Sequence, residues 1–175
     1  QKATVVSAIW DASTAAAGQA DFYILLAVAT DTGYSIYRIA RDSILTGTWE
    51  LVDSEACTDT SAFVSLAVNS GELVWSASTM TNPRYVVLST LTGSDLTDQT
   101  SQSGRTVASH KNRIFMGGSV ANPSRLYFSG IGTPHTFATN DFLDIGGDDG
   151  EAIEDLVSVE GLLLVCKVNR LYLIS

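Results

Sequence analysis

The residues best suited to chemistry in this chain form an acidic run on a glycine-rich stretch, DIGGDDGE, at positions 144–151. Its carboxylates belong to Asp144, Asp148, Asp149 and Glu151. Carboxylate oxygens can surround a hard cation such as calcium. The spacing does not match the helix-loop-helix calcium loop, and Asp and Gly also build turns between strands. The sequence therefore favours a turn, keeps these carboxylates as the metal-ligand candidates, and predicts no cofactor.

The two histidines, His110 and His135, are the candidates for acid–base catalysis. Neither lies near a cysteine or the other histidine, and the chain has no Gly-x-Ser-x-Gly nucleophile turn. It also lacks the Gly-Lys-Ser/Thr ending of a phosphate-binding loop. A catalytic triad assembled from distant positions stays open at this point. No catalytic or cofactor-binding residue is predicted, and we expect a protein that is not an enzyme.

A recurring pair of arginine and tyrosine shows how the chain is organised. The tyrosines Tyr37, Tyr85, Tyr127 and Tyr172 follow one another at spacings of 48, 42 and 45 residues, each beside or near an arginine. A repeat of roughly 40 to 50 residues with four short strands is the size of a propeller blade. The pair has two interpretations, a repeated binding face or a repeated packing contact. The sequence favours packing, with the tyrosine between sheets and the arginine on a carbonyl or an acidic neighbour.

Short runs of β-branched and aromatic residues surround each of these tyrosines, bounded by Gly, Asn, Pro and Ser. No segment has apolar residues at helical spacing over a sufficient length. We therefore predict an all-β fold, a single β-propeller region over 1–175. Its four blade-like units cover about 1–55, 56–104, 105–150 and 151–175, and the last one is incomplete. The predicted strands are 4–10, 21–30, 34–40, 48–52, 62–68, 72–77, 84–89, 95–98, two runs joined by Lys111-Asn112, then 125–129, 142–145, 152–158, 162–167 and 170–174.

Composition limits the function classes. Apolar residues make up 45% of the chain, which favours a folded core over disorder. The net charge of −9 argues against a general grip on nucleic acid, because duplex binding needs cations that neutralise phosphates. No run of eighteen apolar residues predicts a membrane span. Cys57 and Cys166 have no metal-ligand spacing and are predicted to be free.

Both ends of the sequence look cut. The chain starts at Gln1 instead of Met and stops after the third strand of the last unit. We therefore expect a fragment of a longer chain. A blade without its outer strand exposes an edge, which another segment would have to complete.

The second half of the chain carries a resemblance. The run HKNRIF at 110–115 leads to SRLYFS at 124–129, then FLDIG at 142–146, GEAI at 150–153 and LLLVCK at 162–167. This order resembles a recurring segment of propeller-bearing virion proteins of tailed bacteriophages, the nozzle or tail tubular proteins. The resemblance covers 105–175 directly and the first hundred residues only through the repeat.

The resemblance implies a structural virion protein of a phage tail or head-to-tail assembly, a nozzle-like scaffold around the DNA exit channel. It implies other virion subunits as partners, a homo-oligomeric ring, transient passage of DNA without specific binding, and a place in the virion tail. The alternative is a receptor- or glycan-binding propeller at the tail tip. A hydrolase on a propeller scaffold is the third hypothesis, and it would require a histidine or carboxylate pair in one cleft.

Overall fold

The structure is a computed structural model that describes residues 23–40, 43, 45, 47–97, 104–147 and 149–175. It also gives the backbone course of residues 4–11. The described residues form β-strands, turns and loops and contain no α-helix. This confirms the all-β prediction. No helix long and apolar enough to cross a bilayer occurs in the described part of the chain.

The strands form four antiparallel sheets, and each sheet takes its strands from one continuous stretch of sequence. The first sheet contains β1 (Thr4–Asp11), β2 (Tyr23–Thr30), β3 (Gly33–Ala40) and β4 (Glu50–Ala56). The second contains β5 (Ser65–Asn69), β6 (Glu72–Ser76), β7 (Arg84–Val87) and β8 (Thr92–Asp95). The third contains β9 (Thr106–His110), β10 (Arg113–Gly117), β11 (Arg125–Phe128) and β12 (Phe142–Asp144). The fourth contains β13 (Ile153–Val159), β14 (Leu162–Lys167) and β15 (Leu171–Ile174).

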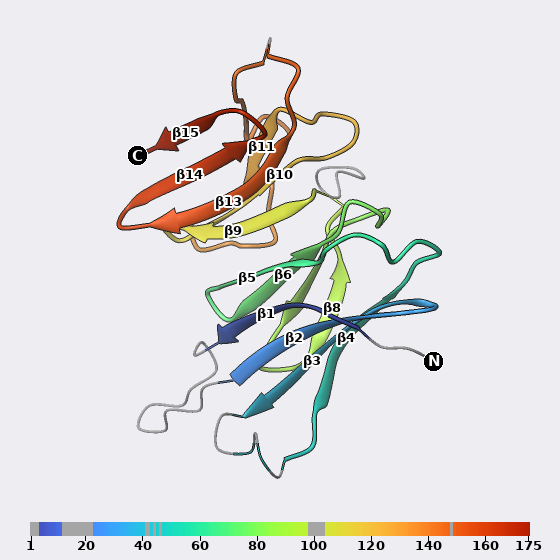
Figure 1. The fold of residues 1–175 in the computed structure, drawn as a ribbon. Coiled ribbons are helices and arrows are strands. Elements are labelled where there is room, and N and C mark those ends of the chain that lie inside the picture. The colour runs from blue at the N-terminus through green and yellow to red at the C-terminus, as the bar shows by residue number, and fades with distance from the viewer. Residues whose placement is uncertain are drawn as a thin grey trace.

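The sheets follow one another in space as they do in sequence (Figure 1). The first strand of each sheet contacts the first strand of the next: β1 contacts β5, β5 contacts β9, and β9 contacts β13. The second strand of each sheet is rich in apolar residues and pairs on both sides, and in the second and third sheets it is buried on both faces. The core is therefore a series of apolar layers between neighbouring sheets.

Each of the three layers combines residues from two adjacent sheets. The first layer includes Leu25 and Ile36 of the first sheet, with Leu73 and Trp75 of the second. The second layer joins Val74 to side chains of the third sheet such as Ile114, Met116 and Tyr127. The third layer packs Phe115 and Leu126 against Ile153, Leu163 and Val165. Burial of these side chains is the main force that holds the sheets together.

Two predicted strands differ from the observed ones. The strand expected at 48–52 is β4, which continues to Ala56 because Asp53 and Glu55 are held by a cation of the second sheet. The edge strand expected at 95–98 is β8, which ends at Asp95 and has an almost fully exposed, Thr- and Ser-containing sequence. Neither strand shows apolar alternation, so pattern analysis misplaced both. The stretch 12–22 between β1 and β2 lies outside the described residues.

Candidate functional site

The acidic run does not gather around one point. Asp149, which is 2% exposed, accepts a hydrogen bond from the ammonium of Lys167 (Nζ to Oδ1, 2.8 Å) and another from the Tyr172 hydroxyl (3.1 Å). The hydrogen bond from Lys167, together with one from the Glu151 backbone amide, lowers the Asp149 pKa from 3.8 to about 2. Asp149 is therefore the carboxylate partner of a buried cation.

The other candidate ligands of this run have separate partners. Asp144 forms a two-pronged pair with Arg125 (2.9 and 3.3 Å), whose hydrogen bond lowers the Asp144 pKa. Glu151 accepts hydrogen bonds from the backbone and side-chain amides of Asn169 (3.2 and 2.8 Å). Asp148 lies outside the described residues. Across the described ranges, no three His, Cys, Asp or Glu side chains converge as a metal site.

Lys167 is fully buried at the end of β14 and ties the third and fourth sheets together. Besides Asp149, its ammonium donates to the Ile145 carbonyl and to the Ser124 hydroxyl (3.2 Å). Ser124 in turn donates to the Glu151 carbonyl (2.9 Å). A buried ammonium needs such acceptors, since transfer out of water is costly for a charge. We call Lys167, Asp149, Tyr172 and Ser124 the lysine cluster.

Gly146 lets the acidic loop approach this cluster. Its φ of +56° is a conformation that side chains rarely adopt. A Cβ at this position would collide with the Tyr172 hydroxyl and the Asp149 carboxylate. The Asp-Gly composition of the run therefore serves a close loop contact, in agreement with the turn that the sequence favoured.

A second ionic cluster joins the first and second sheets. Arg84 on β7 makes a two-pronged pair with Asp53 of β4 (2.8 and 2.9 Å) and also reaches Glu55 (3.1 Å) and Asp95 (2.7 Å). The Trp75 indole donates a third hydrogen bond to Asp53 (2.9 Å). The hydrogen bonds to Asp53 raise the Arg84 pKa. We call these five residues the arginine cluster, and it locks β4 against the neighbouring sheet.

The repeated arginines and tyrosines are thus explained mainly by packing. Arg38, Arg84, Arg125 and Arg170 each pair with a carboxylate. That part of the predicted packing contact is confirmed. Tyr85, Tyr127 and Tyr172 lie in or against apolar layers between sheets. Tyr37 differs, because it lies on the outer face of the first sheet.

His110 ends β9 and is 5% exposed. Its Nδ1 lies 2.9 Å from the Ser158 hydroxyl on β13, and its Nε2 has no hydrogen-bond partner among the described residues. Burial lowers the His110 pKa, with a smaller contribution from Lys111, because a doubly protonated ring would bury a charge. Among the described residues no carboxylate is hydrogen-bonded to this ring, and its hydrogen bond to Ser158 joins the third and fourth sheets.

His135, from the loop between β11 and β12, joins the second and third sheets instead. Its Nδ1 lies 2.6 Å from a Glu72 carboxylate oxygen on β6, and its ring stacks on Tyr85 of β7 at a centroid distance of 4.7 Å. Within the described residues no serine or cysteine is hydrogen-bonded to this histidine. The structure does not bring the two histidines together, and each links a different pair of sheets.

The inner strands are connected by one hydrogen bond that recurs. Asn69 is the last residue of β5, and its side-chain amide donates to Ser109, the penultimate residue of β9 (2.9 Å). His110 ends β9 in the same way and contacts Ser158, the penultimate residue of β13. Equivalent positions therefore make equivalent contacts at two successive junctions. The sequence contained this signal as a polar residue, Asn69 or His110, at the end of the first strand of the second and third sheets.

At the opposite ends of the inner strands lies a polar hollow of about 740 Å3. Arg105 and Glu154 form an ion pair across it. Thr106 donates to Asp155 (3.1 Å) and accepts from the Leu156 amide (3.2 Å). These polar groups bind one another across the third and fourth sheets. They therefore serve to join the two sheets and are not left free to bind a ligand.

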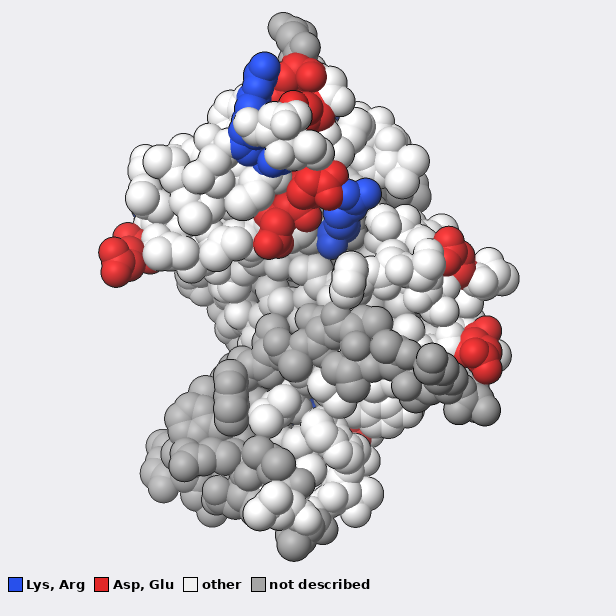
Figure 2. Space-filling view, viewed as in Figure 1, with Lys and Arg blue, Asp and Glu red and all other residues white. Residues whose placement is uncertain are grey.

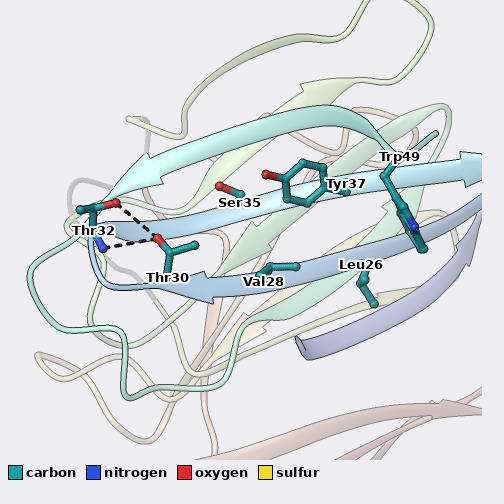
Figure 3. Close-up of a pocket in the computed structure, with 7 residues that line it drawn as sticks. All are labelled: Leu26, Val28, Thr30, Thr32, Ser35, Tyr37 and Trp49. Atoms are coloured by element: carbon teal, nitrogen blue, oxygen red, sulfur yellow. Dashed lines mark hydrogen bonds between the residues drawn. The ribbon is translucent and has the colours of Figure 1, made fainter. Parts of the chain in front are cut away.

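A different hollow, of about 610 Å3, lies on the outer face of the first sheet (Figure 3). Its lining combines aromatic and aliphatic side chains with hydroxyls and has no charged residue: Leu26, Val28, Thr30, Thr32, Ser35, Tyr37 and Trp49. The threonines lie at the β2–β3 turn and Trp49 toward the other end. Sequence analysis singled out no residue of this surface as a site.

Charged side chains are sparse on the face of the molecule in Figure 2: the Lys and Arg side chains there adjoin acidic ones, and other acidic side chains stand alone toward the left and right edges. This arrangement agrees with the local ion pairs described above. Cys57 and Cys166 are both free. Cys57 donates to the carbonyls of Asp59 and Thr79 (3.0 and 3.2 Å), which places its thiol at the junction of the first two sheets.

No protein-family model matches this chain. A search of the curated proteins finds no significant match either. The resemblance to virion propellers therefore depends on the motif residues of the second half alone.

Proposed function

We propose that this chain is a structural, non-enzymatic β-propeller segment whose work is to hold a rigid shape. The observation that carries the proposal is the polar bonding at each junction between sheets, over and above the apolar layers. The arginine cluster, the Asn69–Ser109 and His135–Glu72 contacts, and the lysine cluster occupy the three junctions in turn. Such satisfied networks fix the geometry of neighbouring sheets.

The consecutive four-stranded meanders, with their first strands in contact, support a propeller arrangement of blades around an axis. In this proposal the four sheets are consecutive propeller blades arranged along an arc. The fourth blade consists of the three described strands. An experimental structure should show the inner strands β1, β5, β9 and β13 around one axis. Two stacked sandwiches without a shared axis would overturn the propeller.

We further propose that the scaffold belongs to a phage tail or head-to-tail assembly, as the motifs at 110–167 imply. In a nozzle-like ring of subunits the net charge of −9 would discourage the wall from gripping passing DNA, since like charges repel. Immunogold labelling of tailed particles, purified from the source of the sequence, should place an antibody against this chain at the tail. Label on the capsid, or none on particles, would contradict this assignment.

The proposal that the wall does not bind passing DNA is tested separately. Fluorescence anisotropy with a labelled duplex should show no saturable binding at about 100 µM protein and low salt, where a basic protein would already bind non-specifically. A basic DNA-binding domain of similar size serves as the positive control. Saturable binding would contradict passage without a grip.

A second candidate, glycan or receptor binding, is favoured by the hollow of Figure 3. Tyr37 and Trp49 offer aromatic faces beside the hydroxyls of Thr30, Thr32 and Ser35, a combination suited to sugar rings. A glycan array that gave saturable binding, lost in Trp49→Ala and kept in the control Phe63→Ala, an exposed aromatic residue outside the hollow, would support this candidate over the scaffold alone.

A further inference from the structure

The inner sheets present alternate residues of their second strands to opposite neighbours. On β6, Leu73 and Trp75 pack toward the first sheet, whereas Val74 packs toward the third. On β10, Ile114 packs toward the second sheet and Phe115 toward the fourth. The second and third sheets thus each have a face that meets the preceding sheet and a face that meets the following one.

The same alternation continues on two faces that no described strand covers. On β2, Leu25 belongs to the first apolar layer, so Leu26 and Val28 point away from it, next to Tyr37 and Leu51 across the strands. We call these last four residues the head face. Leu51 is 50% exposed.

The fourth sheet has the corresponding surface on its other side. On β14, Leu163 and Val165 belong to the third layer, so Leu164 and Cys166 point away from it. Val157 and Leu173 flank Leu164, and Leu171 flanks Cys166. We call Val157, Leu164, Leu171 and Leu173 the tail face. Leu171 and Leu173 are 59% and 61% exposed, which is unusual for two leucines on adjacent rows of one sheet.

We propose that a second copy of this chain occupies these faces, the tail face of one copy on the head face of the other. The inference rests on the sheet-stacking scaffold proposed above and not on the virion assignment. Each of the three internal junctions joins a face of the tail kind to a face of the head kind, so the contact between copies continues an interface that the molecule already contains.

Charge and symmetry agree with this occupant. Neither set of four residues contains a charged side chain, and the exposed Asp155, in register with Cys166, lies beside the tail face. A head-to-tail contact is heterologous, and it closes into a ring if the rotation between copies permits. Two copies of four sheets would give eight, the upper end of the usual range of about four to eight blades.

Sedimentation velocity of the whole chain provides the test. At about 100 µM, above the micromolar end of affinities for interfaces of standard size, we expect a dimer of twice 18.6 kDa or a larger head-to-tail oligomer. Leu173→Glu on the tail face and Leu51→Glu on the head face should each weaken self-association by at least about 30-fold, because an unpaired charge would enter a desolvated contact.

A mixture of the two variants separates head-to-tail from face-to-face association. Leu173→Glu leaves a head face intact and Leu51→Glu leaves a tail face intact, so a 1:1 mixture should regain a mixed dimer. Ile131→Glu, at a 66% exposed position in the β11–β12 loop, is the matched control and should associate like the wild type. Near-ultraviolet circular dichroism checks that each variant folds, and Leu171→Glu is a second tail-face variant.

A wild-type chain that is monomeric at about 100 µM would overturn the proposal, since standard interfaces bind more tightly than this. So would an oligomer that Leu51→Glu leaves intact, because the tail faces would then meet each other. Absence of tail labelling on phage particles would disprove the virion assignment but would not affect the measurement of self-association. The proposal of self-association and the proposal of a viral origin can therefore be disproved independently.

Discussion

The first and the last junctions between sheets both bury a cation, but they treat it differently. Arg84 is 15% exposed and shares its guanidinium among Asp53, Glu55 and Asp95, of which Glu55 and Asp95 are 32% and 40% exposed. Lys167 is fully buried and has one carboxylate partner, Asp149, which is buried as well. The arginine cluster is open to water at its rim, whereas the lysine cluster is closed.

This difference predicts at which junction removal of the cation would destabilise the protein more. If an open cluster loses its cation, water can reach the exposed carboxylates and replace part of the lost hydrogen bonding. If a closed cluster loses its cation, a buried carboxylate is left without a counter-charge, which is among the most destabilising changes known in proteins. The two junctions therefore predict different responses to equivalent substitutions.

The largest effect is expected from Lys167→Met, which keeps the volume and removes the ammonium. Because Asp149 then stays buried with only the longer contact to the exposed Arg170 (3.5 Å) as an ion pair, the melting temperature should fall by about 10 °C. Lys111→Met, on the exposed turn between β9 and β10, is the matched control and should leave the melting temperature within about 1 °C. Differential scanning calorimetry measures both. The double variant Lys167→Met/Asp149→Asn should recover part of the loss, and no recovery would show that the pair is not the cause.

A smaller effect is expected from Arg84→Met at the open cluster. We expect a fall of about 6 °C in the melting temperature, mostly from Asp53, which is the least exposed of the three carboxylates. Arg84→Lys keeps the charge but cannot form the two-pronged pair with Asp53, so it should lie between Arg84→Met and the wild type. If Arg84→Met proved more harmful than Lys167→Met, water access would not be what separates the two junctions.

Acid should weaken the contribution of the lysine cluster to stability. The folded Asp149 pKa, about 2, is below the ordinary 3.8, so the folded state binds its proton less readily than the unfolded state. The stabilisation is therefore complete above about pH 4 and is lost as the pH falls toward about 2. Urea unfolding at a series of pH values should show a falling midpoint in this window. The slope should be smaller in Asp149→Asn, and an unchanged slope would assign the acid sensitivity to other carboxylates.

Strand content and repeat length could be predicted from the sequence because apolar runs and turn residues are local signals. The runs 162–167 and 72–77 coincide closely with β14 and β6. Asp53 and Lys167 could not be recognised as junction residues, because each owes its role to a partner far away in the sequence. A strand that carries Asp53 and Glu55 looks like a polar loop until Arg84 is placed beside it. The ion pairs of the acidic run could not be predicted for the same reason, since the cations that pair with Asp144 and Asp149 come from positions 125, 167 and 170.

The smallest expected effect concerns the hydrogen bond that recurs along the inner strands. Since Asn69 occupies in β5 the place of His110 in β9, His110→Asn should keep a hydrogen bond with Ser158 and change the melting temperature at pH 8 by no more than about 2 °C. Burial lowers the folded His110 pKa below its ordinary 6.5, so its stabilising contribution is present above pH 6.5 and is lost as the pH falls through the folded value. Melting temperatures measured from about pH 8 to about pH 5 should therefore fall more steeply in the wild type than in His110→Asn. Equal slopes would show that groups other than His110 govern this range, and a large loss at pH 8 would show that Asn69 and His110 are not equivalent.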